Sequence, residues 1–458
     1  MNDWDAPLDG DDSVDAASST KIQKLQTPLG TFDILPDEHI YYTHIKKVVR
    51  HRCRQSGFRR ITTPSFEYSD VFQRGIGDTT DIVQKEMYTF NDRNERSLSL
   101  KPEGTAGVVR AYIQHGMKEL PQPVELYYIE PHFRYDRPQK GRYRQFWQYG
   151  SEIIGESDPA LDAQIVHLSH KILEDLGVAH LFTLQVNSIG CPICRATYIT
   201  DLQNYYFGKE RSLCENCVGR LHKNPLRLLD CKEEDCQILA QLAPQLKTYL
   251  CKECREFHSH FLEFLDEVGI KYEKNDHLVR GLDYYTKTVF EFWDRQQGSQ
   301  NSIGGGGRYD GLVELMGGQP TPAVGVAFGM ERIIQNMKRE KIHVPSKDDM
   351  HVFVAQLGDD AKKKCLKLLW ELRERGIKSV GALGKASMKA QLHLADRFNV
   401  PYTLILGITE VRDGTIIIRN MEKGQQRIVP FDTVLDEVVK LIGENNLDTY
   451  SPGEIGYL

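Results

Sequence analysis

The sequence predicts a protein of mixed α and β structure with about three domains. Its length of 458 residues fits that number at roughly 150 residues per domain. Strand-like and helix-like segments alternate on both sides of residues 190–260, and eight of the ten cysteines fall between positions 191 and 254. Two αβ regions are therefore expected, with a cysteine-rich insertion (186–260) that interrupts the first region.

Residues 1–20 contain six aspartates and neither lysine nor arginine, and we expect them to form a disordered acidic arm. The whole chain has a formal net charge of -6, but without this arm it carries 58 basic and 58 acidic residues. The net charge therefore does not exclude a nucleic-acid partner. The arm lacks the apolar run of a signal peptide, and no segment is apolar enough for a membrane span, so we expect a cytoplasmic protein without a membrane partner.

The first αβ region (21–185 and 261–345) begins with a helix that is expected to follow Pro36 and end near Gly57. Strands are expected at 58–62, 126–129 and 144–153. After the insertion, a Gly-rich turn at 304–307 is expected to precede AVGVAFGMERIIQNM, which reads as a buried strand that leads into a helix. This region should hold the larger core.

A polar linker at 346–349 separates a compact α/β module of residues 350–445 from the rest of the chain. Strands are expected in HVFVAQL, YTLILGI and TIIIRN, and helices in AKKKCLKLLWELRERG, SMKAQLHLADRF and TVLDEVVKLI. Residues 351–440 carry a net charge of +4, which is a local basic surplus. Residues 446–458 are expected to form a tail.

The cysteines of the insertion form four close pairs, three of them C-x-x-C: Cys191/Cys194, Cys214/Cys217, Cys231/Cys236 and Cys251/Cys254. Two such pairs supply the four thiolates of a tetrahedral zinc site, and four cysteine ligands leave no open position for catalysis. We therefore expect structural zinc. The simplest pairing joins the first pair to the second and the third to the fourth, although sequence leaves cross-pairing open.

Two glycine-rich segments are weak nucleotide motifs. GGGGRYDG (304–311) lacks the acidic partner of a dinucleotide loop, and GALGKAS (381–387) lacks the Ser or Thr of a P-loop directly after Lys385. Residues 131–150 are more informative because they carry a net charge of +4 with interleaved aromatic residues. A solvated basic hairpin is the simple alternative. Gln148 and Glu152, however, share one face of a strand, which predicts a pocket for a phosphorylated molecule and a small polar one.

At these residues the chain resembles the histidyl-tRNA synthetases, class II aminoacyl-tRNA synthetases of bacterial type, over residues 22–443. The resemblance is carried by GTFDILP (30–36), TDIVQKEMYTF (80–90), PEGTAG (102–107), RPQKGRYRQFWQ (137–148), VRGLDYYTKTVFEF (279–292), GGGRYDGLVE (305–314) and AFGMERI (327–333). It implies a catalytic domain with a mostly antiparallel sheet and a C-terminal α/β anticodon-binding domain. The second class II motif reads FRYD, with Asp136 where the family usually carries Glu, and Lys101 replaces the more usual Arg.

The resemblance also implies roles for individual residues. Arg134, Arg142 and Arg332 would bind the ATP phosphates, and Arg280 would lie between the histidine carboxylate and the α-phosphate, so that Arg134, Arg280 and Arg332 form the catalytic set. The histidine-binding set would be Glu103, Thr105, Gln148, Glu152, Tyr284 and Tyr285, of which Glu152 and Tyr285 would meet the imidazole nitrogens.

The resemblance implies an enzyme that attaches histidine to tRNA(His) in an ATP-dependent reaction, through a histidyl-adenylate intermediate. It also implies that the reaction uses Mg²⁺ and that the enzyme is a homodimer. A second hypothesis is a non-catalytic relative, the regulatory subunit of ATP phosphoribosyltransferase, which usually lacks the anticodon module. A third is a zinc-ribbon nucleic-acid binder, which would explain the cysteines alone. The sequence favours the first because it retains Arg134, Arg280 and Arg332 together with the C-terminal module.

Overall fold

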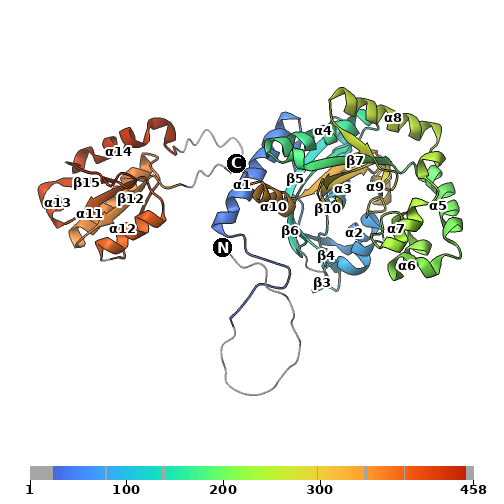
Figure 1. The fold of residues 1–458 in the computed structure, drawn as a ribbon, viewed down its shortest axis with the longest axis horizontal. Helices are drawn as coiled ribbons and strands as arrows, with labels where there is room; N and C mark the ends of the chain where they lie inside the picture. The colour runs from blue at the N-terminus through green and yellow to red at the C-terminus, as the bar shows by residue number, and fades with distance from the viewer. Residues whose placement is uncertain are drawn as a thin grey trace, which may run out of the picture. The chain divides into compact units, whose positions relative to one another are not determined.

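The computed structural model describes residues 24–77, 80–136, 141–296, 298–344, 349–385 and 387–449 (Figure 1). The acidic arm predicted for residues 1–20 lies outside these ranges, as does the end of the predicted tail. The chain divides after Val344 into two compact units. In the described part of the chain, no helix combines the length and apolarity needed to span a membrane.

The first unit is built on an eight-stranded, mostly antiparallel sheet, as predicted. Only the two edge pairs, β1 with β5 and β7 with β8, are parallel. The strand order is β1 (Arg59–Arg60), β5 (Val124–Phe133), β6 (Gln145–Ile154), β11 (Ala323–Gly329), β10 (Gly298–Arg308), β9 (Thr286–Asp294), β7 (Phe182–Ser188) and β8 (Tyr272–Lys274).

Helices cover both faces of this sheet because its central strands are buried on both sides (Figure 1). One face packs against α1 (Pro36–Gln55), α4 (Pro159–Asp175), α8 (Lys252–Glu267) and α10 (Met330–Arg339). The other face packs against α3 (Thr105–Gln114), α9 (Leu312–Leu315) and the insertion. The predicted helix after Pro36 is confirmed as α1, and the strand and helix predicted in residues 323–337 are confirmed as β11 and α10.

The prediction of a Gly-rich turn at 304–307 is wrong, because these glycines lie inside β10, which pairs with β9 on one side and β11 on the other. Atoms of the neighbouring strand β11 lie very close to the backbone of this strand. A Cβ atom built on Gly306 would lie 1.9 Å from the carbonyl oxygen of Gly325, and one on Gly304 would lie 2.3 Å from the Phe328 ring. Glycine is therefore required here for close approach of neighbouring strands and not for a turn.

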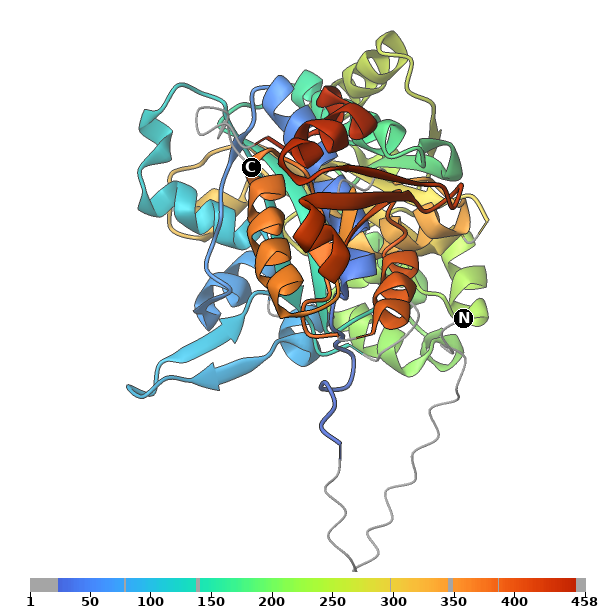
Figure 2. The same ribbon diagram turned by 90° about the vertical axis from the view of Figure 1, so that its left-hand side faces the viewer.

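A small three-stranded sheet lies beside the large one and is formed by β2 (Phe66–Tyr68), β4 (Ser97–Leu100) and β3 (Thr89–Asn91). Figure 2 shows the β3–β4 hairpin projecting away from the large sheet. Between β2 and β3 lie α2 (Ser69–Ile76) and a short π-helical segment, η1 (Ile82–Glu86).

The insertion is helical and contains α5 (Pro192–Tyr206), α6 (Glu215–Lys223), η5 (Pro225–Leu228) and α7 (Glu234–Gln241), before α8 returns to the sheet. It packs on the same face of the sheet as α3 and α9, through apolar residues such as Tyr198, Leu202 and Tyr206. Further short 3₁₀ segments are η2 (Met117–Glu119), η3 (Ala179–Leu181), η4 (Glu210–Ser212), η6 (Leu246–Tyr249), η7 (Phe431–Thr433) and η8 (Glu444–Asn446).

The second unit is a five-stranded α/β sheet with helices on both faces. Its strand order is β13 (Ser379–Gly381), β12 (Val352–Gln356), β14 (Tyr402–Leu406), β15 (Thr415–Asn420) and β16 (Gln426–Pro430). α11 (Asp359–Glu374) and α14 (Val434–Ile442) pack in one apolar cluster, and α12 (Met388–Arg397) packs in the other. The predicted strands and helices are confirmed, whereas β13, β16 and α13 (Ile408–Asp413) were not predicted.

Candidate active site

A cavity of about 620 Å³ opens on the face of the large sheet that carries α3 and the insertion. Its walls come from strands β6, β9, β10 and β11, the start of α3, the loop before β6, and the insertion. Of the residues predicted from sequence, those that line it are Glu103, Thr105, Arg134, Arg142, Gln148, Arg280, Tyr284, Tyr285 and Arg332. The fold therefore gathers residues that lie more than 200 positions apart in the chain.

Glu103 and Gln148 provide acceptors on the cavity wall. The two carboxylate oxygens of Glu103 each accept a backbone N–H at the start of α3, from Thr105 and Ala106, both at 2.8 Å. Burial raises the pKa of Glu103, although these N–H donors oppose that effect. The Oε1 atom of Gln148 is buried without a hydrogen-bond partner among the described residues. An unpaired buried acceptor beside a carboxylate is suited to an ammonium group.

Glu152 is fully buried, and hydroxyl groups donate to both of its carboxylate oxygens. Thr105 donates to Oε1 at 2.8 Å and Tyr309 donates to Oε2 at 2.5 Å. Burial, with a smaller contribution from the charge of Glu103, raises the pKa of Glu152 to about 8, although the two hydroxyl donors act in the opposite direction. The neutral acid is therefore favoured in the free protein near pH 7.

The position of Glu152 depends on a glycine in the adjacent strand. β6 pairs with β11 so that Glu152 lies opposite Gly325. A Cβ atom at Gly325 would lie 1.6 Å from Oε2 of Glu152, so only glycine leaves room for the carboxylate. Gly104 and Gly150 similarly make room for the buried Tyr128 ring, since a Cβ atom at either would approach it to 2.3 Å.

Tyr284, Tyr285 and Arg280 form a further part of the cavity lining. The two tyrosine rings lie 4.6 Å apart, and Tyr284 packs edge-on against Tyr309 at 5.6 Å. The Arg280 guanidinium lies 5.5 Å from the Tyr285 ring centroid and pairs with Glu291. Its Nε is buried and unpaired among the described groups, so it retains a donor that no neighbouring residue uses.

Three arginines face the cavity from separate elements. Arg134 donates to the carbonyl of Pro102 at 2.8 Å, and Arg142 pairs with Asp136 at 3.1 Å. Arg332, in the first turn of α10, donates through Nε to the carbonyl of Gly141 at 3.3 Å. Planar guanidinium groups that converge on one cavity are suited to bind a polyphosphate.

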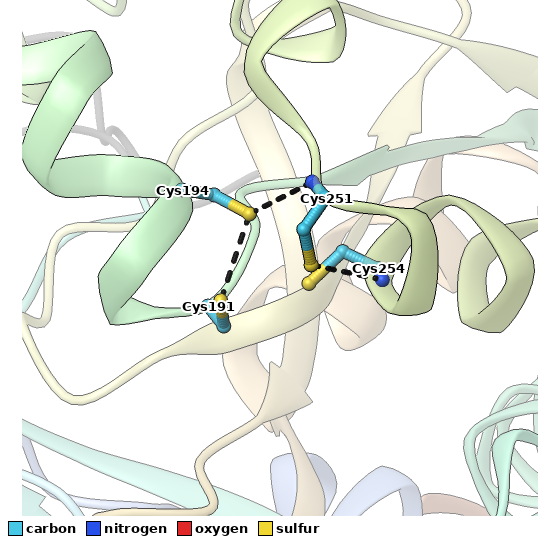
Figure 3. Close-up of side chains that lie close together, drawn as sticks. All are labelled: Cys191, Cys194, Cys251 and Cys254. Carbon is cyan, nitrogen blue, oxygen red and sulfur yellow. Dashed lines mark hydrogen bonds between the residues drawn. The ribbon is translucent and has the colours of Figure 1, made fainter.

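The eight clustered cysteines form two tetrads, each with sulfur atoms within 4.8 Å of one another. The first contains Cys191, Cys194, Cys251 and Cys254, which lie at the starts of α5 and α8 (Figure 3). The Sγ atoms of Cys191 and Cys194 are 3.5 Å apart, close to the ~3.8 Å expected for two sulfurs on a tetrahedral zinc ion. Although burial raises the pKa of Cys191, neighbouring N–H donors lower it to about 7, which favours a thiolate.

The second tetrad contains Cys214, Cys217, Cys231 and Cys236, with the Sγ atoms of Cys214 and Cys231 3.8 Å apart. The simplest pairing predicted from sequence is therefore wrong, because the first cysteine pair joins the fourth and the second joins the third. The reason lies in the fold: α5 leaves the large sheet and α8 returns to it at the same place, whereas the two middle pairs meet within the insertion. The spacing of the cysteines along the sequence does not indicate that the second tetrad lies between the two pairs of the first.

Sequence reasoning missed several residues of this site, and three of them bear on its chemistry. Tyr309 donates to Glu152, Glu291 pairs with Arg280, and Lys232 of the insertion reaches the cavity wall. Tyr309 and Glu291 lie inside the strings GGGRYDGLVE and VRGLDYYTKTVFEF, so a role could have been sought there. No sequence signal marks Lys232. Lys101 is buried against Glu130 at 2.5 Å and does not line the cavity.

The comparisons with known proteins agree with this geometry. The family model described as Histidyl-tRNA synthetase matches residues 30–333, and the one described as Anticodon binding domain matches residues 351–441. A histidine–tRNA ligase of Acetivibrio thermocellus is 44% identical over 413 residues, covering 90% of this chain and 99% of the relative. One of Dehalococcoides mccartyi is 45% identical over 417 residues, covering 91% and 100%.

Among solved structures, the apo histidyl-tRNA synthetase of S. aureus matches with a TM-score of 0.76 and 33% identity, over 91% of this chain and all of that one. A structure from Bacillus halodurans, described as an ATP phosphoribosyltransferase regulatory subunit/histidyl-tRNA synthetase, matches with a TM-score of 0.60 at 18% identity, which shows the shared fold alone.

Proposed function

The chain belongs to the histidyl-tRNA synthetase family, and from this premise we propose that the cavity is where its substrates react. The chain is a histidine–tRNA ligase, a class II synthetase that attaches histidine to tRNA(His). The sequence identity to histidine–tRNA ligases extends over most of the chain, which favours this activity over a role as a regulatory subunit of ATP phosphoribosyltransferase. The C-terminal unit is an anticodon-binding domain.

Glu152 is the single observation that carries our assignment of the amino-acid pocket. It is a fully buried carboxylate that does not itself line the cavity, but one of its two hydroxyl partners, Thr105, does. Arginines line other parts of the same cavity. Glu152 and Tyr285 would meet the two imidazole nitrogens, with Tyr284 beside them. An amino acid without ring nitrogens would form neither of these hydrogen bonds and would place an apolar side chain against buried polar groups, which disfavours its binding.

The remaining site residues divide between the amino-acid backbone and ATP. Glu103, Thr105 and Gln148 would hold the α-amino group. This assignment is supported by the unpaired Gln148 Oε1 atom and the Glu103 carboxylate on the same wall.

Arg134, Arg142 and Arg332 would bind the ATP phosphates, and Arg280 would lie between the histidine carboxylate and the α-phosphate. Attack of one anion on another requires such cations. The products are histidyl-adenylate and pyrophosphate, and a ribose hydroxyl at the end of tRNA(His) then displaces AMP. ATP carries Mg²⁺ in this family, and the carboxylates of Glu86 and Glu291 on the cavity wall provide the oxygen ligands that this ion prefers.

We assign structural zinc to both cysteine tetrads, since each offers four cysteine sulfurs within 4.8 Å of one another, and four cysteine ligands leave no open position. Thiolates persist in a reducing compartment, which supports a cytoplasmic location. Domain limits are proposed at 21–185 and 261–345 for the catalytic domain, 186–260 for the insertion and 350–445 for the anticodon-binding domain. A homodimer follows from the class II resemblance, and the exposed Phe66, Tyr68 and Phe90 of the small sheet offer apolar surface for it.

ATP–pyrophosphate exchange measured with each of the twenty amino acids tests the function and its specificity together. We expect exchange with histidine and at most a background rate with the other nineteen. Exchange with a different amino acid would refute the pocket assignment. If no amino acid supported exchange, the proposal that this cavity catalyses amino-acid activation would be refuted.

A further inference from the structure

Lys232 is a cation on the cavity wall that neither the sequence motifs nor the arginine set accounts for. Lys232 follows Cys231 directly, at the point where the second cysteine tetrad borders the cavity, and both residues line it. Its side chain comes from the insertion, opposite the arginines of the catalytic domain. Arg142, Arg332 and Lys232 all line this same cavity.

The ion pairs of the cavity separate its cations into two groups. Carboxylates of the protein already pair with several of them: Arg220 with Asp81 at 3.0 Å, Arg227 with Asp230 at 3.4 Å, Arg142 with Asp136 at 3.1 Å, and Arg280 with Glu291. Within the described ranges, no carboxylate pairs with Arg134, Arg332 or Lys232. Like charges gathered without counter-ions repel one another, and a bound anion relieves this repulsion.

We propose that Lys232 binds the phosphate chain of ATP, and the pyrophosphate that leaves it, together with Arg134 and Arg332, which likewise have no carboxylate partner among the described residues. The insertion thereby contributes a residue to the first reaction step. This inference rests on the proposed function of the cavity. Lys232 is a binding residue for the leaving group: it neutralises charge that passes to pyrophosphate when the bond to the α-phosphorus breaks, and it transfers no proton.

The sequence supplies a matched control. Lys252 follows Cys251 of the first tetrad just as Lys232 follows Cys231, but it is exposed, pairs with Glu256 at 3.6 Å and does not line the cavity. We compare Lys232→Ala, Lys232→Arg and Lys252→Ala in full-length protein. Zinc content and circular dichroism verify that each variant retains its metal and fold, which is expected because Lys232 is exposed and has no side-chain ion pair among the described residues.

In histidine-dependent ATP–pyrophosphate exchange, Lys232→Ala should raise the KM of ATP and of pyrophosphate about fivefold, the size expected for a partly solvated cation–phosphate contact. The KM of histidine and inhibition by AMP should not change, since neither ligand carries the outer phosphates. Lys232→Arg should stay within about twofold of the native protein, and Lys252→Ala should match it.

Three results would overturn the proposal. The first is an unchanged KM for ATP and pyrophosphate in Lys232→Ala. The second is an equal weakening of AMP inhibition, which would indicate a general disturbance of the site. The third is unchanged exchange with a raised KM for tRNA in aminoacylation, which would assign Lys232 to a tRNA phosphate. Failure of the function itself is distinguishable, because the native protein would then show no histidine-dependent exchange.

Discussion

Replacing Glu152 with Gln should remove a specific pH dependence from the stability of the free protein. The carboxyl is fully buried and its pKa is about 8 instead of the ordinary 4.5. A raised pKa in the folded state means that this group favours folding most below pH 4.5, and that the contribution is lost as pH rises through 8. The difference between the two pKa values corresponds to about 5 kcal/mol, an order-of-magnitude figure, of which about 4 kcal/mol falls between pH 5 and pH 9.

Glutamine has the shape of the neutral acid: its amide oxygen can accept from one of the two hydroxyls of Thr105 and Tyr309, and its NH2 group can donate to the oxygen of the other. Glu152→Gln should therefore match the native protein near pH 5 and exceed its unfolding free energy by about 4 kcal/mol near pH 9. Urea titrations at several pH values, followed by tryptophan fluorescence, measure the difference, and the exposed Glu267→Gln controls for loss of one carboxylate. Parallel pH profiles for native protein and Glu152→Gln would refute the reasoning, because they would mean that Glu152 is ionised in both states.

Three further predictions concern other parts of the site. Arg280→Ala should lower histidine-dependent pyrophosphate exchange by at least about 100-fold with an unchanged circular dichroism spectrum; near-native exchange would exclude its proposed role. Gly325→Ala should cost about 1–3 kcal/mol of stability and raise the KM of histidine, because its Cβ would lie 1.6 Å from Glu152; a native KM would show that the carboxylate can move without loss. Purified protein should contain two zinc equivalents per chain by elemental analysis, and Cys236→Ser about one; finding no metal in native protein would return the cysteines to a packing role.

The sequence predicted those elements whose pattern is local. The apolar face of α1, the polar face of β6 with Gln148 and Glu152, and the alternating strands of the C-terminal unit depend on periodicities of 3.6 and 2 residues. The arginine and histidine-binding sets came from the family resemblance, and the fold brings nearly all of them to one cavity.

What the sequence could not predict depends on contacts between distant segments. Gly304–Gly307 look like a turn until the pairing of β10 with both neighbours is known, because that pairing makes glycine obligatory. Tyr309 becomes a partner of Glu152 only through the pairing of β10 with β11 and of β11 with β6. The cysteine tetrads likewise follow the path of the insertion and not the spacing of the pairs.

The nesting of the two tetrads also sets an order in which they can be completed as the chain is synthesised. All four ligands of the inner tetrad are present once Cys236 has left the ribosome, whereas the outer tetrad waits for Cys254. If zinc binds as we propose, the segment that holds Lys232 can thus fold around its metal before the remaining strands of the large sheet, β8 to β11, have been synthesised. The outer tetrad then closes around a finished module and joins its two ends, so the length of the enclosed segment can vary at little entropic cost.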